Sequence, residues 1–199
     1  MKIGAALLAA GRSQRFGDDD KLLSVIGGQP LIRRAIAAFE ASSVAEIVVV
    51  TPIDADRLMA AGGQGRWRYV ANPDAEDGMA TSLRVGLSAL GEDCAGALVA
   101  LADMPYCSAA MIDDLCAAFA QANGEAIVFP ENPDGRQGHP VLWPRRLFGD
   151  LLKVQGDKGG KAILSANRDA WHPVPIADET AFFDVDTASD LDAARKLRT

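Results

Sequence analysis

The sequence predicts an α/β fold in which a mostly parallel central sheet is covered by helices on both faces. Short apolar runs of strand length alternate with segments whose apolar residues recur at helical spacing. The apolar runs are hydrophobic throughout, which is typical of strands buried on both sides. The chain has 199 residues, 49% of them hydrophobic, which suits one α/β domain with a substantial core.

The first 130 residues follow a regular succession of strand and helix. Strands are expected at residues 3–8, 46–51, 67–70, 97–101 and 126–129. Helices are expected at residues 30–41, 54–61, 79–90 and 109–120. Pro30 suits the first position of a helix, because its missing N–H is not needed there. In such sheets ligands bind beyond the carboxyl ends of the strands, so residues that follow strands are the candidates for function.

The pattern changes after residue 131. A polar, turn-rich loop at 132–138 precedes a strand of different orientation at 139–143. Helices are expected at 147–154, 161–167 and 188–197, with a short extended segment at 172–175. We therefore expect one domain, residues 1–199, with a core at 1–130, an elaboration at 131–183 and a closing helix within 184–199.

Composition excludes several classes of protein. The net charge of −7 argues against non-specific nucleic-acid binding, which needs basic surface. No stretch approaches the ~18 apolar residues of a membrane span, and the N-terminal apolar run is too short for a signal peptide. Cys94, Cys107 and Cys116 form no CxxC pair, and His139 and His172 do not complete a metal-ligand spacing with them. A Cys/His metal site is therefore not expected. We expect a cytoplasmic protein with reduced, structural thiols and no membrane partner.

The loop after the first strand is suited to a polyphosphate. LAAGRSQRFG, residues 8–17, combines two glycines, a hydroxyl and two arginines, and Lys21 follows. Glycine allows close backbone approach to oxygen atoms, while Arg and Lys neutralise charge. The spacing matches neither GxGxxG nor GxxxxGK[ST]. On its own, the segment is equally consistent with an ordinary strand-to-helix loop that carries scattered charges.

Two carboxylates follow apolar runs. Asp103, in ALADMP at residues 100–105, projects from a strand end, and a carboxylate there is a natural ligand for Mg²⁺. DVDT, residues 184–187, follows an apolar pair and is expected to present Asp184 or Asp186 at a second strand end. Alternatively, Asp103 is a helix-capping or turn residue ahead of Ser108, and Asp186 or Thr187 caps the closing helix.

Three further segments carry candidate binding residues. In NPDAEDGMATSL, residues 72–83, Gly78 allows close approach to a planar base and Ser82 offers a hydroxyl; alternatively the glycine ends a loop and the serine faces water. GRQGHPVLW, residues 135–143, holds His139 beside Pro140, although a lone histidine is commonly structural. GDKGGKAIL, residues 156–164, presents lysines around glycines at a helix start, which suits a substrate phosphate.

Taken together and in this order, these motifs closely resemble the MobA-like NTP-transferase family, and within it the molybdenum cofactor cytidylyltransferases. The resemblance implies a Rossmann-like three-layer α/β/α nucleotidyltransferase fold with a mostly parallel sheet. It also implies Mg²⁺-dependent transfer of a nucleotidyl group from an NTP to the terminal phosphate of a molybdopterin-type acceptor, with release of pyrophosphate. The core would bind the NTP, and residues 131–183 would face the acceptor.

The resemblance assigns roles to individual residues. Catalysis would involve Arg15, Lys21 and Asp103. Nucleotide binding would involve Leu8, Ala9, Ala10, Gly11, Arg12, Ser13, Arg15, Lys21, Asn72, Gly78, Ser82 and Asp103. The metal ligands would be Asp103 and Asp186. Acceptor binding would involve Gly138, His139, Pro140, Gly156, Asp157, Lys158 and Lys161.

The choice of substrates is less constrained. LAAG, in place of LAGG, resembles the cytidylyl-transferring branch, and the methyl group of Ala10 would narrow the base pocket in favour of CTP. A GTP-using guanylyltransferase and a sugar- or alditol-phosphate nucleotidyltransferase are alternatives on the same scaffold. A non-catalytic chaperone that carries the cofactor to a molybdoenzyme is an alternative of another class. The family also implies transient docking to a molybdoenzyme or its maturation factor.

Overall fold

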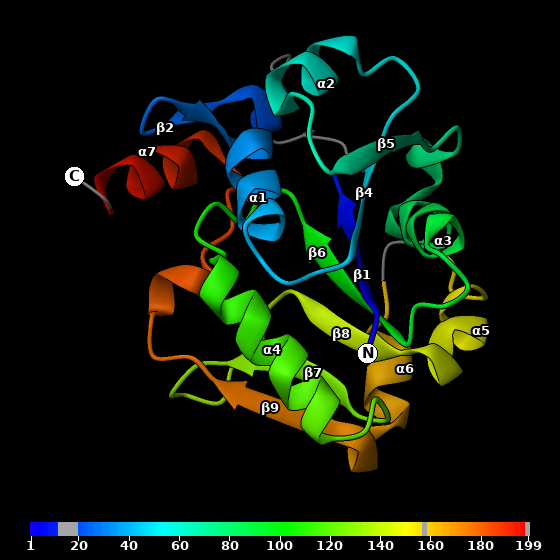
Figure 1. The fold of residues 1–199 in the computed structure, drawn as a ribbon. Helices are drawn as coiled ribbons and strands as arrows, with labels where there is room; N and C mark the ends of the chain where they lie inside the picture. The colour runs from blue at the N-terminus through cyan, green and yellow to red at the C-terminus, as the bar shows by residue number, and fades with distance from the viewer. Residues whose placement is uncertain (12–19, 157–158, 198–199) are drawn as a thin grey trace.

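A computed structural model describes residues 1–11, 20–156 and 159–197 of the chain. Within them, one seven-stranded sheet has the order β5-β4-β1-β6-β8-β7-β9 (Figure 1). Its strands are β1 (Ile3–Leu8), β4 (Glu46–Thr51), β5 (Trp67–Ala71), β6 (Gly96–Leu101), β7 (Ile127–Glu131), β8 (Val141–Pro144) and β9 (Trp171–Pro175). Strands β5, β4, β1 and β6 are parallel. Strand β8 is antiparallel to β6 and β7, which agrees with the different orientation expected there.

Helices cover both faces of the sheet, as predicted. One face carries α1 (Leu31–Glu40), α2 (Asp56–Gly62), α4 (Ala109–Gln121) and α7 (Ala188–Lys196). The other face carries α3 (Met79–Ala89), α5 (Phe148–Leu151) and α6 (Lys161–Ala166). The fold therefore has three layers, α/β/α.

Strand β1 shows why the sheet lies at the centre. All six of its residues are buried. Ala5 and Leu7 pack into the core under α1 and α4, while Ala6 and Leu8 pack into the core under α3. A strand needs apolar residues at every position when both of its faces are covered. Gly86 lets α3 approach closely, because a Cβ there would lie 2.8 Å from that of Ala6.

The segment from 131 to 183 is built into the sheet, because it contributes β8 and the edge strand β9. The helix expected at 147–154 is shorter than predicted. The structure has a 3-10 turn at Arg145–Leu147 followed by α5, and the chain leaves the helix after Leu151. The apolar pair Phe182–Phe183 does not form the expected strand. It lies at the end of a 3-10 turn, Glu179–Phe182, that the Asp178 carboxylate caps by accepting from the Thr180 N–H.

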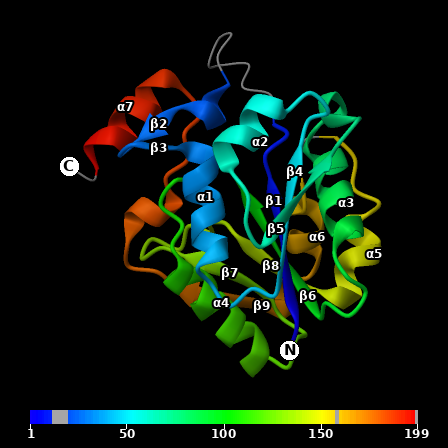
Figure 2. The same cartoon turned by 45° about the horizontal axis from the view of Figure 1, so that its top comes forward.

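A small hairpin was not predicted. Strands β2 (Val25–Ile26) and β3 (Gln29–Pro30) pair around Gly27 and Gly28, which both adopt positive φ. Such turns favour glycine, but strands of two residues leave no periodic pattern to detect. The hairpin lies beside α7, where Arg195 Nε donates to the Val25 carbonyl at 3.1 Å (Figure 2).

The three cysteines are free thiols, as expected. Burial raises the pKa of Cys107 to about 12 and that of Cys116 to about 11, so both thiols stay protonated at neutral pH. In the described part of the chain, no helix is long and apolar enough to cross a membrane.

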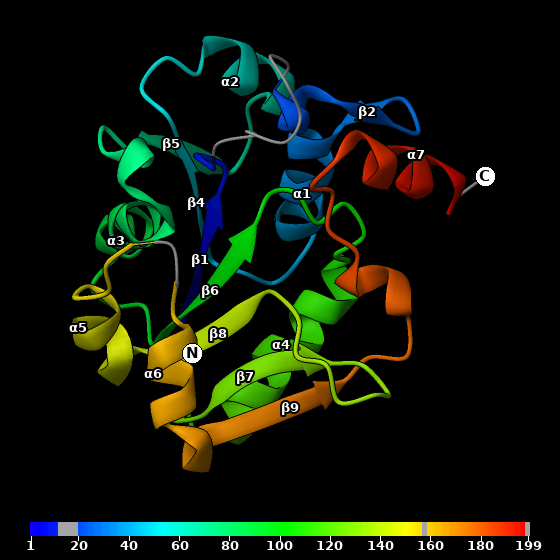
Figure 3. The ribbon, with the colours of Figure 1, turned by 180° about the vertical axis from the view of Figure 1, so that it is seen from behind.

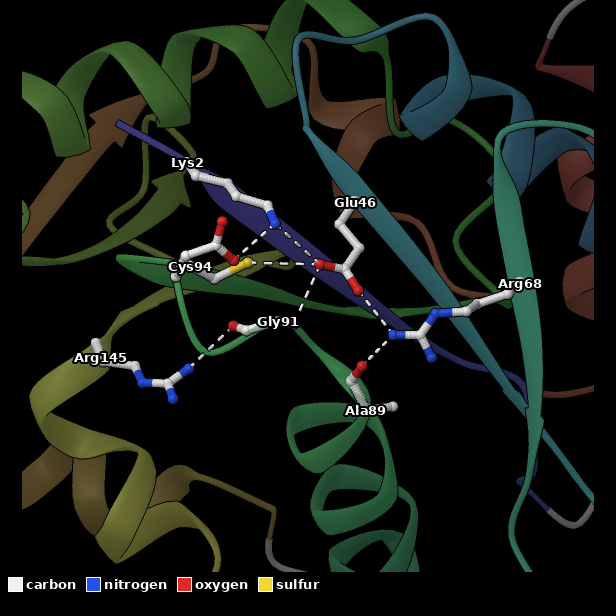
Figure 4. A network of polar contacts seen from close by, with 8 residues as sticks. Lys2, Glu46, Arg68, Ala89, Gly91, Cys94 and Arg145 are labelled. Atoms are coloured by element: carbon white, nitrogen blue, oxygen red, sulfur yellow. Dashed lines mark hydrogen bonds and ion pairs between the residues drawn. The ribbon is translucent and has the colours of Figure 1, made fainter.

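A polar network holds the amino-terminal edge of the parallel strands (Figure 4). Glu46, the first residue of β4, receives hydrogen bonds from Arg68 Nη2 at 2.7 Å and from the Gly91 N–H at 3.1 Å. Lys2 Nζ lies 3.6 Å from Glu46 Oε2 and 2.7 Å from Asp93 Oδ1. Burial raises the pKa of Glu46, but the hydrogen bonds from Arg68 and Gly91 outweigh it, and the pKa is lowered. The network joins the chain before β1, β4, β5 and the loop before β6.

We expect Glu46→Gln to lower the free energy of unfolding at pH 7 by about 1 kcal/mol, because charged hydrogen bonds are lost at a partly exposed position. Since the folded-state pKa of Glu46 is lowered, its contribution is complete above the ordinary value near 4.5 and disappears as the pH falls. Urea unfolding of both proteins at pH 7 and pH 3 measures this. An equal difference at the two pH values would contradict the prediction.

Candidate functional site

The candidate site lies at the carboxyl-terminal edge of β1 and β6. Leu8 ends β1 and is followed by Ala9 and Ala10, which are buried, and by Gly11, which is exposed. The Ala9 N–H donates to the Val50 carbonyl at 2.8 Å, which fixes the start of the loop against β4. The predicted phosphate-binding residues Arg12, Ser13 and Arg15 lie outside the described residues.

Lys21 lies between two carboxylates. Its Nζ is 2.7 Å from Asp103 Oδ2 and 3.2 Å from Asp186 Oδ1. Asp103 is the second residue after β6, Lys21 begins a 3-10 turn, and Asp186 precedes α7. The structure therefore brings these three predicted residues together, although 165 positions separate Lys21 from Asp186. Of the two candidates Asp184 and Asp186, Asp186 places its carboxylate 3.2 Å from Lys21 Nζ.

The backbone holds the two carboxylates together. The Val185 N–H donates to the Asp103 carbonyl at 3.1 Å. Asp190 Oδ2 accepts from the Asp186 N–H at 3.2 Å and from the Thr187 N–H at 2.8 Å, and Thr187 Oγ1 accepts from the Asp190 N–H. This reciprocal pair is a capping box at the start of α7. Thr187 is thus a cap, as one sequence interpretation had it, and the cap positions Asp186.

The pair of Asp103 and Lys21 is largely removed from water. The side chains of Lys21 and Asp103 are 12% and 17% exposed, whereas that of Asp186 is 50% exposed. Burial lowers the pKa of Lys21, but the charges and hydrogen bonds of Asp103 and Asp186 outweigh it, so the pKa is raised. The ammonium group stays charged at neutral pH and balances the carboxylates.

The donor set fits a divalent cation that is shared with a substrate. Asp103 Oδ1 is buried and has no hydrogen-bond partner among the described residues. In the same residues, no group of three or more His, Cys, Asp or Glu side chains could hold a metal. Two carboxylates are nevertheless enough for Mg²⁺, which keeps water ligands and binds substrate phosphates. Among the described residues of this cluster, Asp103 and Asp186 are the two carboxylates that could hold such an ion.

The loop before α3 is braced internally. Asn72 Nδ2 donates to Thr81 Oγ1 at 2.8 Å and to Ser82 Oγ at 3.0 Å, while its Oδ1 accepts from the Asp74 N–H. Asn72 and Ser82 are 1% and 4% exposed, so Ser82 does not face water. Gly78, at the N-cap of α3, has φ of +103°, a conformation that favours glycine. The side chains of Asn72 and Ser82 thus set the shape of the loop.

The described acceptor candidates lie directly before β8 and between α5 and the first residue of α6. Gly138 packs against Phe182, where a Cβ would lie 2.6 Å from the ring. Burial lowers the pKa of His139, and nearby Lys161 acts in the same direction, so the imidazole is neutral at pH 7. Its Nδ1 is buried, with no hydrogen-bond partner in the described chain. Pro140 is buried beside it, Lys161 begins α6, and Asp157 and Lys158 lie outside the described residues.

A cavity of about 510 Å³ opens between α3 and the segment that follows α5. Asp77, Thr81 and Arg84 line one side, and Leu152, Lys153 and Gly156 line the other. Of these, only Gly156 was a candidate from the sequence. The sequence analysis did not identify Arg84 and Lys153 as candidates, because charged residues on a helix or just after one usually face water.

Residues 5–174 match the family described as the MobA-like NTP transferase domain. The chain belongs to this family. It is 32% identical to the probable molybdenum cofactor guanylyltransferase of Pyrococcus furiosus, over 100% of this chain and 97% of that protein. It is also 26% identical to the nicotine blue oxidoreductase of Paenarthrobacter nicotinovorans, over 95% of this chain and 94% of that protein.

Solved structures confirm the fold. Rv0371c from Mycobacterium tuberculosis superimposes with a TM-score of 0.86 at 24% identity, covering 98% of each chain. A structure of the same protein in complex with manganese superimposes with a TM-score of 0.82 at 22% identity, covering 98% of this chain and 99% of that one. The match over residues 5–174 confirms the predicted family, and the solved structures confirm the three-layer α/β/α fold. The preference for CTP stays a prediction, since the relative from Pyrococcus furiosus is named a guanylyltransferase.

We expect Lys21→Met to lower the free energy of unfolding by about 2 kcal/mol, because it leaves the largely buried Asp103 carboxylate without its cation. Asp103→Asn removes the charge that needs balancing, so the double variant should lose less than the sum of the single losses. Denaturant unfolding of the four proteins measures the coupling, which should reach at least about 1 kcal/mol. Strictly additive losses would mean that the ion pair contributes nothing to the fold.

Proposed function

We propose that this protein transfers a nucleotidyl group from an NTP to the phosphate of a molybdopterin-type acceptor and releases pyrophosphate. The observation that carries the proposal is the cluster of Lys21, Asp103 and Asp186 at the carboxyl edge of β1 and β6. The cluster adjoins a glycine-containing loop in a chain that belongs to the MobA-like NTP transferase family. The relative named a molybdenum cofactor guanylyltransferase supports the acceptor.

In the proposed reaction an acceptor phosphate oxygen attacks the α-phosphorus of the NTP. The new P–O bond forms as the bond between the α-phosphorus and the bridging oxygen breaks, and pyrophosphate leaves with that electron pair. A phosphate monoester is already a nucleophile, so no protein nucleophile is needed. The contribution of the protein is to position the two substrates and to neutralise their charge.

A divalent cation, Mg²⁺ by preference, is proposed to bind at Asp103 and Asp186. Two observations support this assignment: Asp103 Oδ1 has no hydrogen-bond partner in the part of the chain that the structure describes, and the Mycobacterium tuberculosis protein forms a complex with manganese. Such an ion, when bound, neutralises triphosphate charge and polarises the phosphoryl group under attack. Lys21, whose charged ammonium group contacts the same two carboxylates, adds a second positive charge that would neutralise the triphosphate.

We assign the remaining predicted residues to the two substrates. Residues 1–130 bind the NTP through Leu8 to Ser13, Arg15 and Lys21, and the braced loop of Asn72, Gly78 and Ser82 faces its base. Residues 131–183 face the acceptor, through Gly138–Pro140 and the segment 156–161. CTP is the proposed donor, because LAAG at residues 8–11 resembles the cytidylyl-transferring branch and a methyl group at Ala10 is expected to narrow the base pocket. GTP is the alternative that the named guanylyltransferase favours.

The first test measures pyrophosphate release with Mg²⁺ and molybdenum-loaded molybdopterin, comparing CTP, GTP, ATP and UTP. We expect turnover with CTP. A preference for GTP would keep the reaction but refute the interpretation of Ala10. No release with any of these nucleotides, and release with a sugar or alditol phosphate in place of the pterin, would assign another acceptor. Tight pterin binding without release under all conditions would indicate a carrier.

The second test concerns the metal ligands. We expect Asp103→Asn to lower kcat/KM by about 10²-fold or more, because a charge-stabilising group at the reacting phosphates is lost. Asp186→Asn should lower it by a smaller factor, since that side chain is half exposed. We also expect Mn²⁺ to raise the melting temperature of the unaltered protein, and this stabilisation should disappear in Asp103→Asn. Asp192→Asn, an exposed change on α7, is the matched control, and unchanged activity in Asp103→Asn would refute the assignment.

A further inference from the structure

The Lys21 ammonium group lies at the point where the two candidate metal ligands meet. Its Nζ is 2.7 Å from Asp103 Oδ2 and 3.2 Å from Asp186 Oδ1. An ammonium group and a divalent cation both bind to the lone pairs of carboxylate oxygens at short distance. The oxygen atoms that would bind a cation are therefore already in contact with a positive charge of the protein itself.

Backbone contacts set the spacing of the two carboxylates. Figure 3 shows the chain before α7 passing beside the loop that follows β6, and there the Val185 N–H donates to the Asp103 carbonyl at 3.1 Å. The capping box of Thr187 and Asp190 fixes the backbone next to Asp186. Because these contacts do not involve Lys21, the carboxylates stay close together when the ammonium group is removed.

The second oxygen of Asp103 offers no separate place for the ion. Asp103 Oδ1 is buried, and no group in the described part of the chain forms a hydrogen bond with it. Mg²⁺ loses its water ligands reluctantly, so it binds first at oxygens that border on solvent. The side chain of Asp186 is half exposed, and an ion that approaches along this side chain meets the oxygens that contact Lys21. A metal ion and the ammonium group therefore compete for the same oxygens.

The Lys21 side chain can leave the carboxylates while its backbone stays in place. Lys21 begins a 3-10 turn, Lys21–Leu23, which Asp20 caps by accepting from the Leu22 N–H at 2.9 Å. The Ser24 N–H donates to the Lys21 carbonyl at 3.0 Å, and Leu22 is buried. A lysine side chain is a flexible stem of four carbons that ends in a compact charge. Rotation about the bonds of this stem is enough to withdraw the ammonium group.

We infer that the Lys21 ammonium group is a resident counter-ion of the metal site, which a divalent cation replaces between Asp103 and Asp186. The exchange keeps the largely buried Asp103 carboxylate balanced at every stage, because one cation takes the place of another. Two cations at the same oxygens would repel each other, so the bound ion displaces Lys21. The released ammonium group is then available to the phosphates of the NTP. This inference rests on the proposed function for the identity of the metal ligands.

The first experiment measures Mn²⁺ binding without nucleotide, from the electron paramagnetic resonance signal of the unbound ion. We expect Lys21→Met to bind Mn²⁺ at least about tenfold more tightly than the unaltered protein, because no ammonium group competes. Lys21→Arg keeps a positive charge and should bind no more tightly than the unaltered protein. Lys153→Met removes a lysine that is 79% exposed and is the matched control for net charge, so its affinity should be unchanged.

The tighter binding in Lys21→Met should depend on the same two carboxylates. Adding Asp103→Asn to Lys21→Met should abolish it, and adding Asp186→Asn should weaken it. Equal Mn²⁺ affinities of Lys21→Met and the unaltered protein would overturn the inference. Tight binding that survives the addition of Asp103→Asn would overturn it as well.

A second measurement uses the unaltered protein, so it does not depend on the folding of Lys21→Met. Acylation by acetic anhydride, quantified for each lysine by mass spectrometry, reports how reactive each amino group is. Saturating Mn²⁺ should raise the acylation rate of Lys21 severalfold, because its amino group leaves a largely buried ion pair. The rate for Lys153 should not change. An unchanged rate for Lys21 would mean that the ion and the ammonium group bind together, which would overturn the exchange.

The outcomes separate this inference from the proposed function. Tighter Mn²⁺ binding in Lys21→Met and faster acylation of Lys21, without pyrophosphate release from any nucleotide, would support the exchange and refute the proposed function alone. Turnover that is lost in Asp103→Asn, together with equal Mn²⁺ affinities of Lys21→Met and the unaltered protein, would refute the exchange alone. No Mn²⁺ binding to either protein would overturn both the exchange and the assignment of the metal ligands.

Discussion

The ion pairs of Lys21 with Asp103 and Asp186 are the constraint on which the rest of the site depends. They join the first loop of the chain, the end of β6 and the approach to α7. The Asp103 carboxylate is largely buried, and a buried charge without a partner lowers the stability of the fold. The folded chain therefore needs the Lys21 ammonium group beside it. The same requirement brings together, before any substrate binds, the charges that the proposed reaction uses.

The polar residues at the amino-terminal edge of the sheet stabilise the fold, whereas those at the carboxyl-terminal edge form the candidate site. At the amino-terminal edge, Glu46 joins Lys2, Arg68 and the Gly91 backbone in a network that satisfies its own charges (Figure 4). At the carboxyl-terminal edge, one oxygen of Asp103 has no hydrogen-bond partner within residues 1–11, 20–156 and 159–197. Parallel strands turn their carboxyl ends to one side, so binding loops gather there while the opposite edge can be closed.

Rigid support surrounds the site. Asn72 holds the loop before α3 from inside, and the capping box of Thr187 and Asp190 fixes the backbone beside Asp186. A site that works by positioning and charge neutralisation gains from such preorganisation, because less rearrangement is needed when substrates bind. The cavity wall is held in a similar way, because Arg84 donates a hydrogen bond to the Val154 carbonyl in the segment after α5.

The sequence by itself determined the layered α/β fold, the family, and the presence of Asp103 at the end of a buried strand. These features are local: apolar runs, helical spacing and short motifs are visible within one window of the chain. The tertiary structure alone decided that Asp186 and Asp103 share Lys21, partners 165 and 82 positions away. It also decided that Ser82 turns inward to Asn72 and that α5 ends early beside Arg84. Such pairings depend on how distant segments pack, and no local pattern encodes which side chains will meet.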